Sequence, residues 1–289
     1  MKKIIIYWIC LFVNIILLQA RPVAAETMDV FDSETGLYTS LEIDPNLTSI
    51  EGDLPSAEKE NVPLSATESA PETENWVQVD GRQYPYSSVV YINYRGNCSG
   101  TLIGPYTVLT AAHCFPLGPN TDPAEIRVNA GGEETAQKAK GVRLFLSVHY
   151  GMYKKEHYDN ETATYDWAVI VLNKPLGKKN GYLGVKAVNL QAGDSIHVVG
   201  FPGDKIHNRP WHSWGEITAV LQDSNTFYHT APTAGGNSGG PVLVNEDPGS
   251  IVGLATFIRE EPYRGGGTLV CEKLLSFVAA HRNDTPQTN

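Results

Sequence analysis

The sequence predicts an all-β protein in which two antiparallel barrels lie side by side and a helix ends the chain. Between Tyr84 and Phe257 the apolar runs are short and β-branched, as in "WAVIVL" and "SIHVVGF". Gly, Pro, Asn and Asp divide these runs at intervals of roughly ten residues, which is typical of antiparallel barrels or a sandwich. A helical spacing of apolar residues appears only near the C-terminus, in "TLVCEKLLSFVAAH".

The length of this region favours two barrels over one small barrel, with the division near Gly184. We therefore expect an N-terminal barrel over residues 75–184. A C-terminal barrel and the terminal helix are expected over residues 185–289.

Residues 1–25 have the composition of a signal peptide. A "KK" pair precedes a long apolar run from Ile4 to Leu18, and "VAA" at 23–25 supplies the small residues that precede a signal-peptidase cut. The alternative is a retained membrane anchor, but Asn14 interrupts the run. We expect export, with no stable membrane association after the signal is removed.

Residues 26–74 form an acidic segment with 13 acidic residues and one basic residue, Lys59. Large apolar groups are few and show no clear periodicity, so the segment is predicted to be disordered because burial would not offset its ordering entropy. The remaining chain is close to neutral, which argues against a nucleic-acid partner.

Three cysteines remain once Cys10 leaves with the signal. Cys98 and Cys114 bracket the segment around His113, and a disulfide between them would contribute about 3 kcal/mol. Cys271 is then unpaired, and its place among helically spaced apolar residues predicts a buried thiol.

Three residues form a candidate catalytic set. His113 ends the strand-like run "VLTAAHCF", Asp166 precedes the apolar run "WAVIVL", and Ser238 lies in "TAGGNSGGPV". A serine hydroxyl needs a base to take its proton, and an aspartate can hold the histidine in the tautomer that acts as that base. The alternatives are a structural histidine, a turn-capping aspartate and a surface turn at Ser238.

The glycines around Ser238 fit an oxyanion hole. The backbone N–H groups of Gly236 and Ser238 could converge on the oxygen of an attacked carbonyl, and bulky side chains there would obstruct the approach.

The sequence resembles the chymotrypsin-like serine peptidases through three motifs in the family's order, "TAAHC", "YDWAVI" and "GGNSGGP". Within that family it is similar to the bacterial glutamyl-endopeptidase branch, in the segments "CSGTLIGPYTVLTAAHC", "GFPGDK" and "TAGGNSGGP". The resemblance implies two six-stranded β-barrels with the site between them. It implies His113 as general base and acid, Asp166 as its orienting group and Ser238 as nucleophile, with Gly236 and Ser238 N–H groups as oxyanion donors. It also implies secretion from a Gram-positive bacterium.

Two features of the sequence concern activation. Asn237 stands where animal digestive enzymes carry an aspartate that pairs with a new amino terminus, so that mode of activation is not expected. The acidic segment resembles a propeptide, and "NWVQVDGR" resembles a mature start, which would place the cut after Glu74. Removal of the segment is expected to be needed for full activity.

The resemblance places the substrate pocket at Thr233, Pro232, Ala255 and Thr256. Thr233 matches a threonine of glutamate-specific relatives, but Ala255 replaces their histidine, and a buried carboxylate needs paired donors. Pro232 replaces the aspartate of trypsin-like enzymes. Arg259 or Arg264 could supply a replacement cation or be solvated loop residues, so acidic and small or apolar preferences both remain open.

The leading hypothesis is a secreted, monomeric serine endopeptidase that cleaves proteins or peptides through an acyl-enzyme. It needs no cofactor, and the other histidines, among them His212 and His229, show no metal-ligand spacing. A non-catalytic binding protein or toxin with the same fold is the alternative. A hydrolase of small esters or amides would use the same chemistry.

Overall fold

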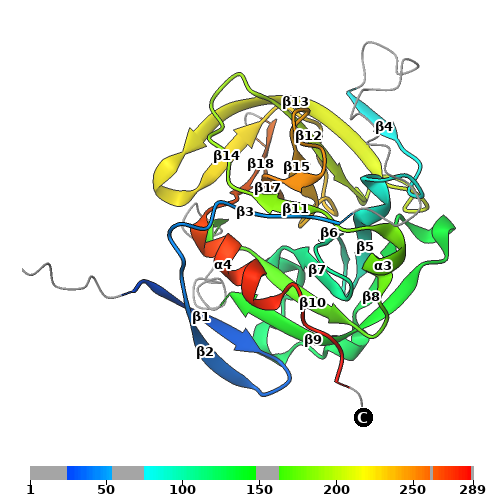
Figure 1. The fold of residues 1–289 in the computed structure, drawn as a ribbon. Coiled ribbons are helices and arrows are strands. Elements are labelled where there is room, and N and C mark those ends of the chain that lie inside the picture. The colour runs from blue at the N-terminus through cyan, green and yellow to red at the C-terminus, as the bar shows by residue number, and fades with distance from the viewer. Residues whose placement is uncertain (1–24, 54–74, 148–162, 261–262, 288–289) are drawn as a thin grey trace, which may run out of the picture.

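A computed structural model describes residues 25–53, 75–147, 163–260 and 263–287 of the 289-residue chain. It contains two closed, six-stranded antiparallel barrels and a C-terminal helix (Figure 1), so the predicted fold class is confirmed. The predicted signal peptide, residues 1–25, lies outside the described residues except for its last position.

The first barrel has the strand order β10-β7-β6-β5-β8-β9 and closes where β9 pairs with β10. Its strands are β5 (Val89–Asn93), β6 (Asn97–Leu102), β7 (Thr107–Thr110), β8 (Arg127–Ala130), β9 (Lys138–Ser147) and β10 (Ala168–Leu172).

The second barrel has the order β12-β15-β17-β18-β14-β13 and closes where β12 pairs with β13. Its strands are β12 (Ser195–Gly200), β13 (Trp211–Leu221), β14 (Thr226–His229), β15 (Pro241–Leu243), β17 (Gly253–Glu260) and β18 (Tyr263–Leu269). The strand β4 (Trp76–Gln78) adds to the edge of β13.

Between the barrels in sequence lie the short helix α3 (Leu176–Asn180) and the strand β11 (Gly184–Lys186). β11 is the middle strand of a three-stranded sheet with β16 (Ser250–Ile251) and β3 (Ser49–Ile50). No helix among the described residues is long and apolar enough to cross a membrane.

The apolar runs of the sequence are buried on both faces of their strands. In β10, Ala168 and Ile170 face the interior of the first barrel, whereas Val169 and Val171 join a core shared by both barrels and the terminal helix. β5 alternates in the same way. Continuous β-branched runs are therefore required, because each face of the strand meets an apolar layer.

The terminal helix α4 (Glu272–His281) packs its apolar side onto the shared core through Leu274, Leu275, Phe277 and Val278. It begins later than the apolar spacing suggests, since Leu269 ends β18. Cys271, the residue before the helix, is buried and unpaired as predicted, and burial raises the pKa of its thiol.

The expectation of disorder for residues 26–74 is wrong over residues 26–53. They form β1 (Thr27–Asp32), β2 (Leu37–Glu42) and β3, and β1 pairs with the edge of β9. Met28 and Val30 alternate along β1 and are 2% and 1% exposed. The average composition of the acidic segment conceals this alternation, and the barrel supplies the partner strand that the segment lacks alone. Residues 54–74 lie outside the described part of the chain.

A buried row of polar rings crosses from the loop before β5 into the second barrel. His212 Nε2 lies 2.8 Å from His197 Nδ1, and His212 Nδ1 lies 3.3 Å from the Tyr86 hydroxyl. Burial, followed by the neighbouring His197, lowers the pKa of His212 to about 3. The pair is therefore held neutral at ordinary pH.

This row predicts an acid-sensitive fold. The pKa of His212 is lower in the folded than in the unfolded protein, so its neutral form stabilises the fold above about pH 6.5, and this contribution declines as the pH falls toward 3. Between pH 7 and pH 4.5 the loss is about 2–3 kcal/mol for this one group. We expect the free energy of unfolding to fall less between pH 7 and pH 4.5 in His212→Gln than in the parent. Urea unfolding measures it, with both proteins in a Ser238→Ala background.

Gln191→Asn, an exposed change in the turn before β12 that removes and adds no titratable group, is the control and should retain the parental loss. Equal pH dependence in His212→Gln and the parent would contradict the prediction.

Candidate active site

His113 lies in a short 3-10 turn, Ala112–Cys114, that follows β7. Its neighbour Cys114 is joined to Cys98 of β6 by a disulfide, as predicted, with the two Cα atoms 6.2 Å apart. The disulfide attaches the histidine turn to the neighbouring strand, so the position of His113 is fixed within the first barrel.

Asp166 holds the same turn from the other side. Its carboxylate is 0% exposed and accepts two hydrogen bonds from His113, one from the backbone N–H at 2.9 Å and one at Nδ1 at 2.6 Å. An Nδ1–H donor leaves Nε2 as the unprotonated nitrogen of a neutral imidazole. The two residues predicted to act together are therefore in contact, although 53 positions separate them.

The Ser238 loop of the second barrel is bound to β6 of the first. Ser99 donates its backbone N–H to the Ser238 carbonyl at 2.8 Å, and its hydroxyl donates to the Gly236 carbonyl at 2.7 Å. The same hydroxyl accepts the N–H of Phe201 at 2.8 Å. Ser99 therefore connects the two barrels at the loop that carries the predicted nucleophile.

Two glycines in this loop are required by the backbone. Gly236 has φ +103° and Gly239 has φ +80°, a region that L side chains rarely adopt. A Cβ at Gly239 would also collide with the Thr110 side chain and the backbone of Ser99. Gly239 is thus required by close contact with the first barrel, and Gly236 by its positive φ and by the nearby backbone of Phe201 and Gly203 in the second barrel.

The N–H groups of the loop divide into two kinds. Those of Asn237, Gly239 and Gly240 donate to backbone carbonyls. In the described part of the chain, those of Gly236 and Ser238 donate to no other protein group. Asn237 is 2% exposed, and its side-chain oxygen accepts the N–H of Ala234 at 3.2 Å, so the loop is braced without a charged amino terminus.

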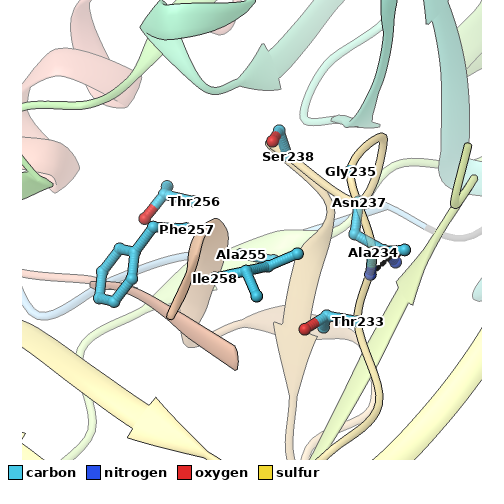
Figure 2. A pocket seen from close by; sticks show the side chains of 9 residues that line it. All are labelled: Thr233, Ala234, Gly235, Asn237, Ser238, Ala255, Thr256, Phe257 and Ile258. Carbon is cyan, nitrogen blue, oxygen red and sulfur yellow. Dashed lines mark hydrogen bonds between the residues drawn. The ribbon is translucent and has the colours of Figure 1, made fainter. Parts of the chain in front are cut away.

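A cavity of about 210 Å³ lies beside Ser238 (Figure 2). The loop lines one side and β17 lines the other, through Thr233, Ala234, Gly235, Asn237, Ser238, Ala255, Thr256, Phe257 and Ile258. Three of the four predicted pocket residues, Thr233, Ala255 and Thr256, are in this lining, and Pro232 is not.

Neither arginine considered as a replacement cation is brought to the cavity by the described contacts. The Arg259 guanidinium lies 5.8 Å from the centre of the Tyr228 ring. The side chain of Arg264 lies outside the described residues, although its backbone belongs to β18.

His229 is a residue whose position the sequence did not reveal. Its imidazole is 0% exposed, and burial lowers its pKa to about 4, although a hydrogen bond with the backbone of Ala231 acts in the opposite direction. The ring lies against Gly265, where a Cβ would overlap it, and Gly265 pairs across the sheet with Ile258 of the cavity wall. The only signal in the sequence was a "GGG" run in β18, which leaves room for a large side chain from a neighbouring strand.

The described residues contain one group of possible metal ligands whose donor atoms lie together, formed by Cys98, His113 and Cys114. Its two sulfur atoms are joined in the disulfide. Because a cysteine binds a metal as a thiolate, and these two cysteines are oxidised to a disulfide, this group does not fit a metal centre.

Two closed six-stranded barrels, with a His–Asp pair on one and a glycine-framed serine loop on the other, define the class of chymotrypsin-like serine peptidases. The family model described as Trypsin matches residues 77–272, well over half of the chain. The chain therefore belongs to the trypsin family of serine endopeptidases, which are hydrolases.

Known relatives support this membership. The glutamyl endopeptidase of Bacillus licheniformis is 29% identical over 168 residues, which are 55% of this chain and 49% of the relative. The extracellular metalloprotease of Bacillus subtilis is 28% identical over 215 residues, 71% of this chain and 62% of the relative. The matches thus span about half to somewhat less than two thirds of these curated relatives.

Among solved structures, a Glu endopeptidase in complex with MPD is similar, with a TM-score of 0.61 and 25% sequence identity. The match covers 74% of this chain and 99% of that chain.

The close contact at Gly239 predicts a sharp effect of one methyl group. Gly239→Ala forces a side chain into the φ +80° backbone and against Thr110, so the loop must move away from the first barrel. We expect peptidase activity to fall by about 100-fold or more, the scale of losing one oxyanion donor. Casein hydrolysis measures the loss, and circular dichroism tests the fold.

Gly249→Ala is the control, because the nearest atom to its added Cβ is the Tyr84 hydroxyl at 3.3 Å. Near-parental activity in Gly239→Ala would show that the loop geometry does not depend on this glycine.

Proposed function

We propose that the chain is a secreted serine endopeptidase that hydrolyses peptide bonds through an acyl-enzyme, with His113, Asp166 and Ser238 as its triad. The observation that carries the proposal is the fully buried Asp166 carboxylate, which accepts both the backbone N–H and Nδ1 of His113. Such an arrangement fixes the tautomer and ring orientation that a general base needs.

In the proposed first half-reaction, His113 Nε2 takes the hydroxyl proton of Ser238 while the serine oxygen bonds to the scissile carbonyl carbon. The negative charge that develops on the carbonyl oxygen is stabilised by the N–H groups of Gly236 and Ser238. His113 then gives its proton to the leaving amine as the C–N bond breaks, which leaves an ester on Ser238.

In the second half-reaction, water attacks the ester, and His113 Nε2 accepts one of its protons. When the new tetrahedral species collapses, His113 returns that proton to the Ser238 oxygen, and the carboxylic acid product leaves. Asp166 stabilises the imidazolium in both halves without itself being protonated.

Removal of the nucleophile should abolish turnover and keep the fold. We expect Ser238→Ala to lower kcat by on the order of 10⁶-fold, and Asp166→Asn by about 10⁴-fold, since the latter favours the wrong tautomer. Both are measured on protein and peptide substrates, with thermal unfolding as the structural check. Asp223→Asn, a change in the turn before β14, is the control.

Retention of substantial activity in Ser238→Ala would remove Ser238 from the mechanism. Absence of activity in the parent itself would favour a non-catalytic binding role. Faster turnover of simple esters than of proteins would favour a small-molecule hydrolase.

For specificity, we propose a preference for Glu or Asp before the scissile bond. The identity to the Bacillus licheniformis glutamyl endopeptidase supports it, as does the hydroxyl of Thr233 in the cavity lining. We propose that His229, which lies behind the cavity wall and outside its lining, supplies the second donor that the Ala255 position lacks. The ring is neutral, because burial lowers its pKa to about 4, so a substrate carboxylate would accept a hydrogen bond from the imidazole N–H in place of the Ala231 backbone.

The contribution of His229 can be read from a ratio of rates. The ratio is kcat/KM for substrates with Glu before the scissile bond divided by kcat/KM for matched substrates with Leu there. We expect His229→Leu to lower this ratio by about 10–100-fold, which is the scale of a hydrogen bond to a charged group. His229→Gln keeps an N–H donor and should retain part of the ratio. Digestion of a mixed-sequence peptide library gives the parental preference.

Parental cuts after small or apolar residues would contradict the acidic preference. An unchanged Glu-to-Leu ratio in His229→Leu would exclude His229 from substrate recognition.

Export through residues 1–25 and processing after Glu74 complete the proposal. The basic start and apolar run support the first, and the resemblance of "NWVQVDGR" to a mature start supports the second. N-terminal sequencing of the protein from culture medium tests both.

A further inference from the structure

The acidic segment 25–53 is attached to the body of the protein at two separate places. β1 extends the sheet of the first barrel by pairing with β9, in the register Val30↔Ser147 to Asp32↔Phe145. Some twenty residues later, β3 pairs with β11, and Asp53 exchanges backbone hydrogen bonds with Tyr182 at 3.0 and 2.9 Å. In Figure 1 the hairpin of β1 and β2 lies beside β9, and β3 runs along β11.

Apolar side chains of the segment belong to the core of the protein. Met28, Val30, Phe31 and Ile43 are between 1% and 5% exposed. Met28, Val30 and Ile43 lie in the same cluster as the buried face of α4, and Phe31 lies in the core of the first barrel. Without the segment, this surface and the edge of β9 would be open to solvent.

Basic side chains of the first barrel and of α4 pair with the acidic groups of the segment. Arg143 of β9 donates two hydrogen bonds to Asp32, from Nε at 2.9 Å and from an Nη at 2.8 Å, and its other Nη lies 2.9 Å from Glu34. Burial by itself raises the pKa of Asp32, but hydrogen bonds from Arg143 and from its own turn outweigh it and lower the pKa. On α4, Lys273 lies 2.8 Å from Glu26, and the Ser276 hydroxyl accepts the N–H of Asp44 at 2.9 Å.

The contact at β11 is too close for side chains. A Cβ at Gly184 would overlap the Ile50 carbonyl and the Gly52 N–H, and a Cβ at Gly52 would overlap the backbone of residues 182–184. Two glycines, one on each side, thus let the backbones meet.

We propose that residues 26–53 remain bound as a second chain after the chain is cut between residues 53 and 75, and that they act as a permanent structural part of the mature protein, in contrast to the expectation from the sequence that full activity requires their removal. Both ends of the cut region have their own anchors. Asp53 is held by Tyr182, and on the other side Asn75 accepts the N–H of Trp214 at 3.2 Å while β4 pairs with β13. Cleavage therefore breaks one covalent connection and none of the contacts described above. No residue of the segment lines the cavity in Figure 2, so its retention leaves that cavity open.

The test uses Ser238→Ala protein that starts at Glu26 and carries a recognition site for an unrelated peptidase between Ala66 and Thr67. After complete cleavage, size-exclusion chromatography at neutral pH and mass spectrometry of the peak determine whether both fragments travel together. We expect a 1:1 complex that survives a run of about an hour and separates only in denaturant. A body peak that has lost the N-terminal fragment would overturn the proposal.

Two variants locate the attachment. Arg143→Ala and Gly184→Ala should each raise the dissociation rate of the cut fragment by about 10-fold or more. The first removes the positively charged partner of buried Asp32, and the second forces β3 away from β11. Arg209→Ala, which removes a surface ion pair with Glu134, is the control and should leave the rate unchanged. If the fragment dissociated from Arg143→Ala and Gly184→Ala at the same rate as from Arg209→Ala, neither contact would hold the fragment.

The outcome does not depend on the proposed peptidase activity, since the protein lacks Ser238 and is cut by an added enzyme. Conversely, an inactive parent would leave the two-chain result intact.

Discussion

Two consecutive residues of β6 position the halves of the candidate active site. Cys98 is joined to Cys114 and so holds the turn of His113, while Ser99 binds the Ser238 loop through its N–H and hydroxyl. A strand is stiff over two residues, so the spacing of the two halves is set by β6 and not by the long connection between the barrels. The proposed chemistry depends on this arrangement, because base and nucleophile come from different barrels.

The glycines and the cavity follow from the same contact. The Ser238 loop can approach β6 closely only with glycine at position 239, and the N–H groups of Gly236 and Ser238 have no protein acceptors among the described residues. On the far side of the cavity, Gly265 and Gly267 of β18 leave room for His229 and Phe227 from β14, and Gly266 leaves room for Phe257 from β17. Small residues thus leave N–H groups for the proposed oxyanion hole and space in which a substrate side chain would be recognised.

The acidic segment has two properties that composition alone conceals. Its charge suggests a solvated leader, yet Asp32 and Glu34 meet Arg143, and Glu26 meets Lys273. Its apolar residues are few, but Met28, Val30 and Ile43 join a core that contains side chains from both barrels and α4. Such a segment is ordered by its contacts with the two barrels and α4, which explains how it can be folded without a hydrophobic core of its own.

The sequence by itself determined the all-β class, the two barrels, the C-terminal helix, the Cys98–Cys114 disulfide and the candidate residues His113, Asp166 and Ser238. These follow from local signals: short β-branched runs, turn residues between them, and motifs whose residue types have few other uses. Tertiary structure alone decided that residues 25–53 form strands, that Pro232 lies outside the cavity lining and that His229 lies behind its wall. Each of these depends on which strands become neighbours, and strand pairing joins residues far apart in the chain that no local pattern connects.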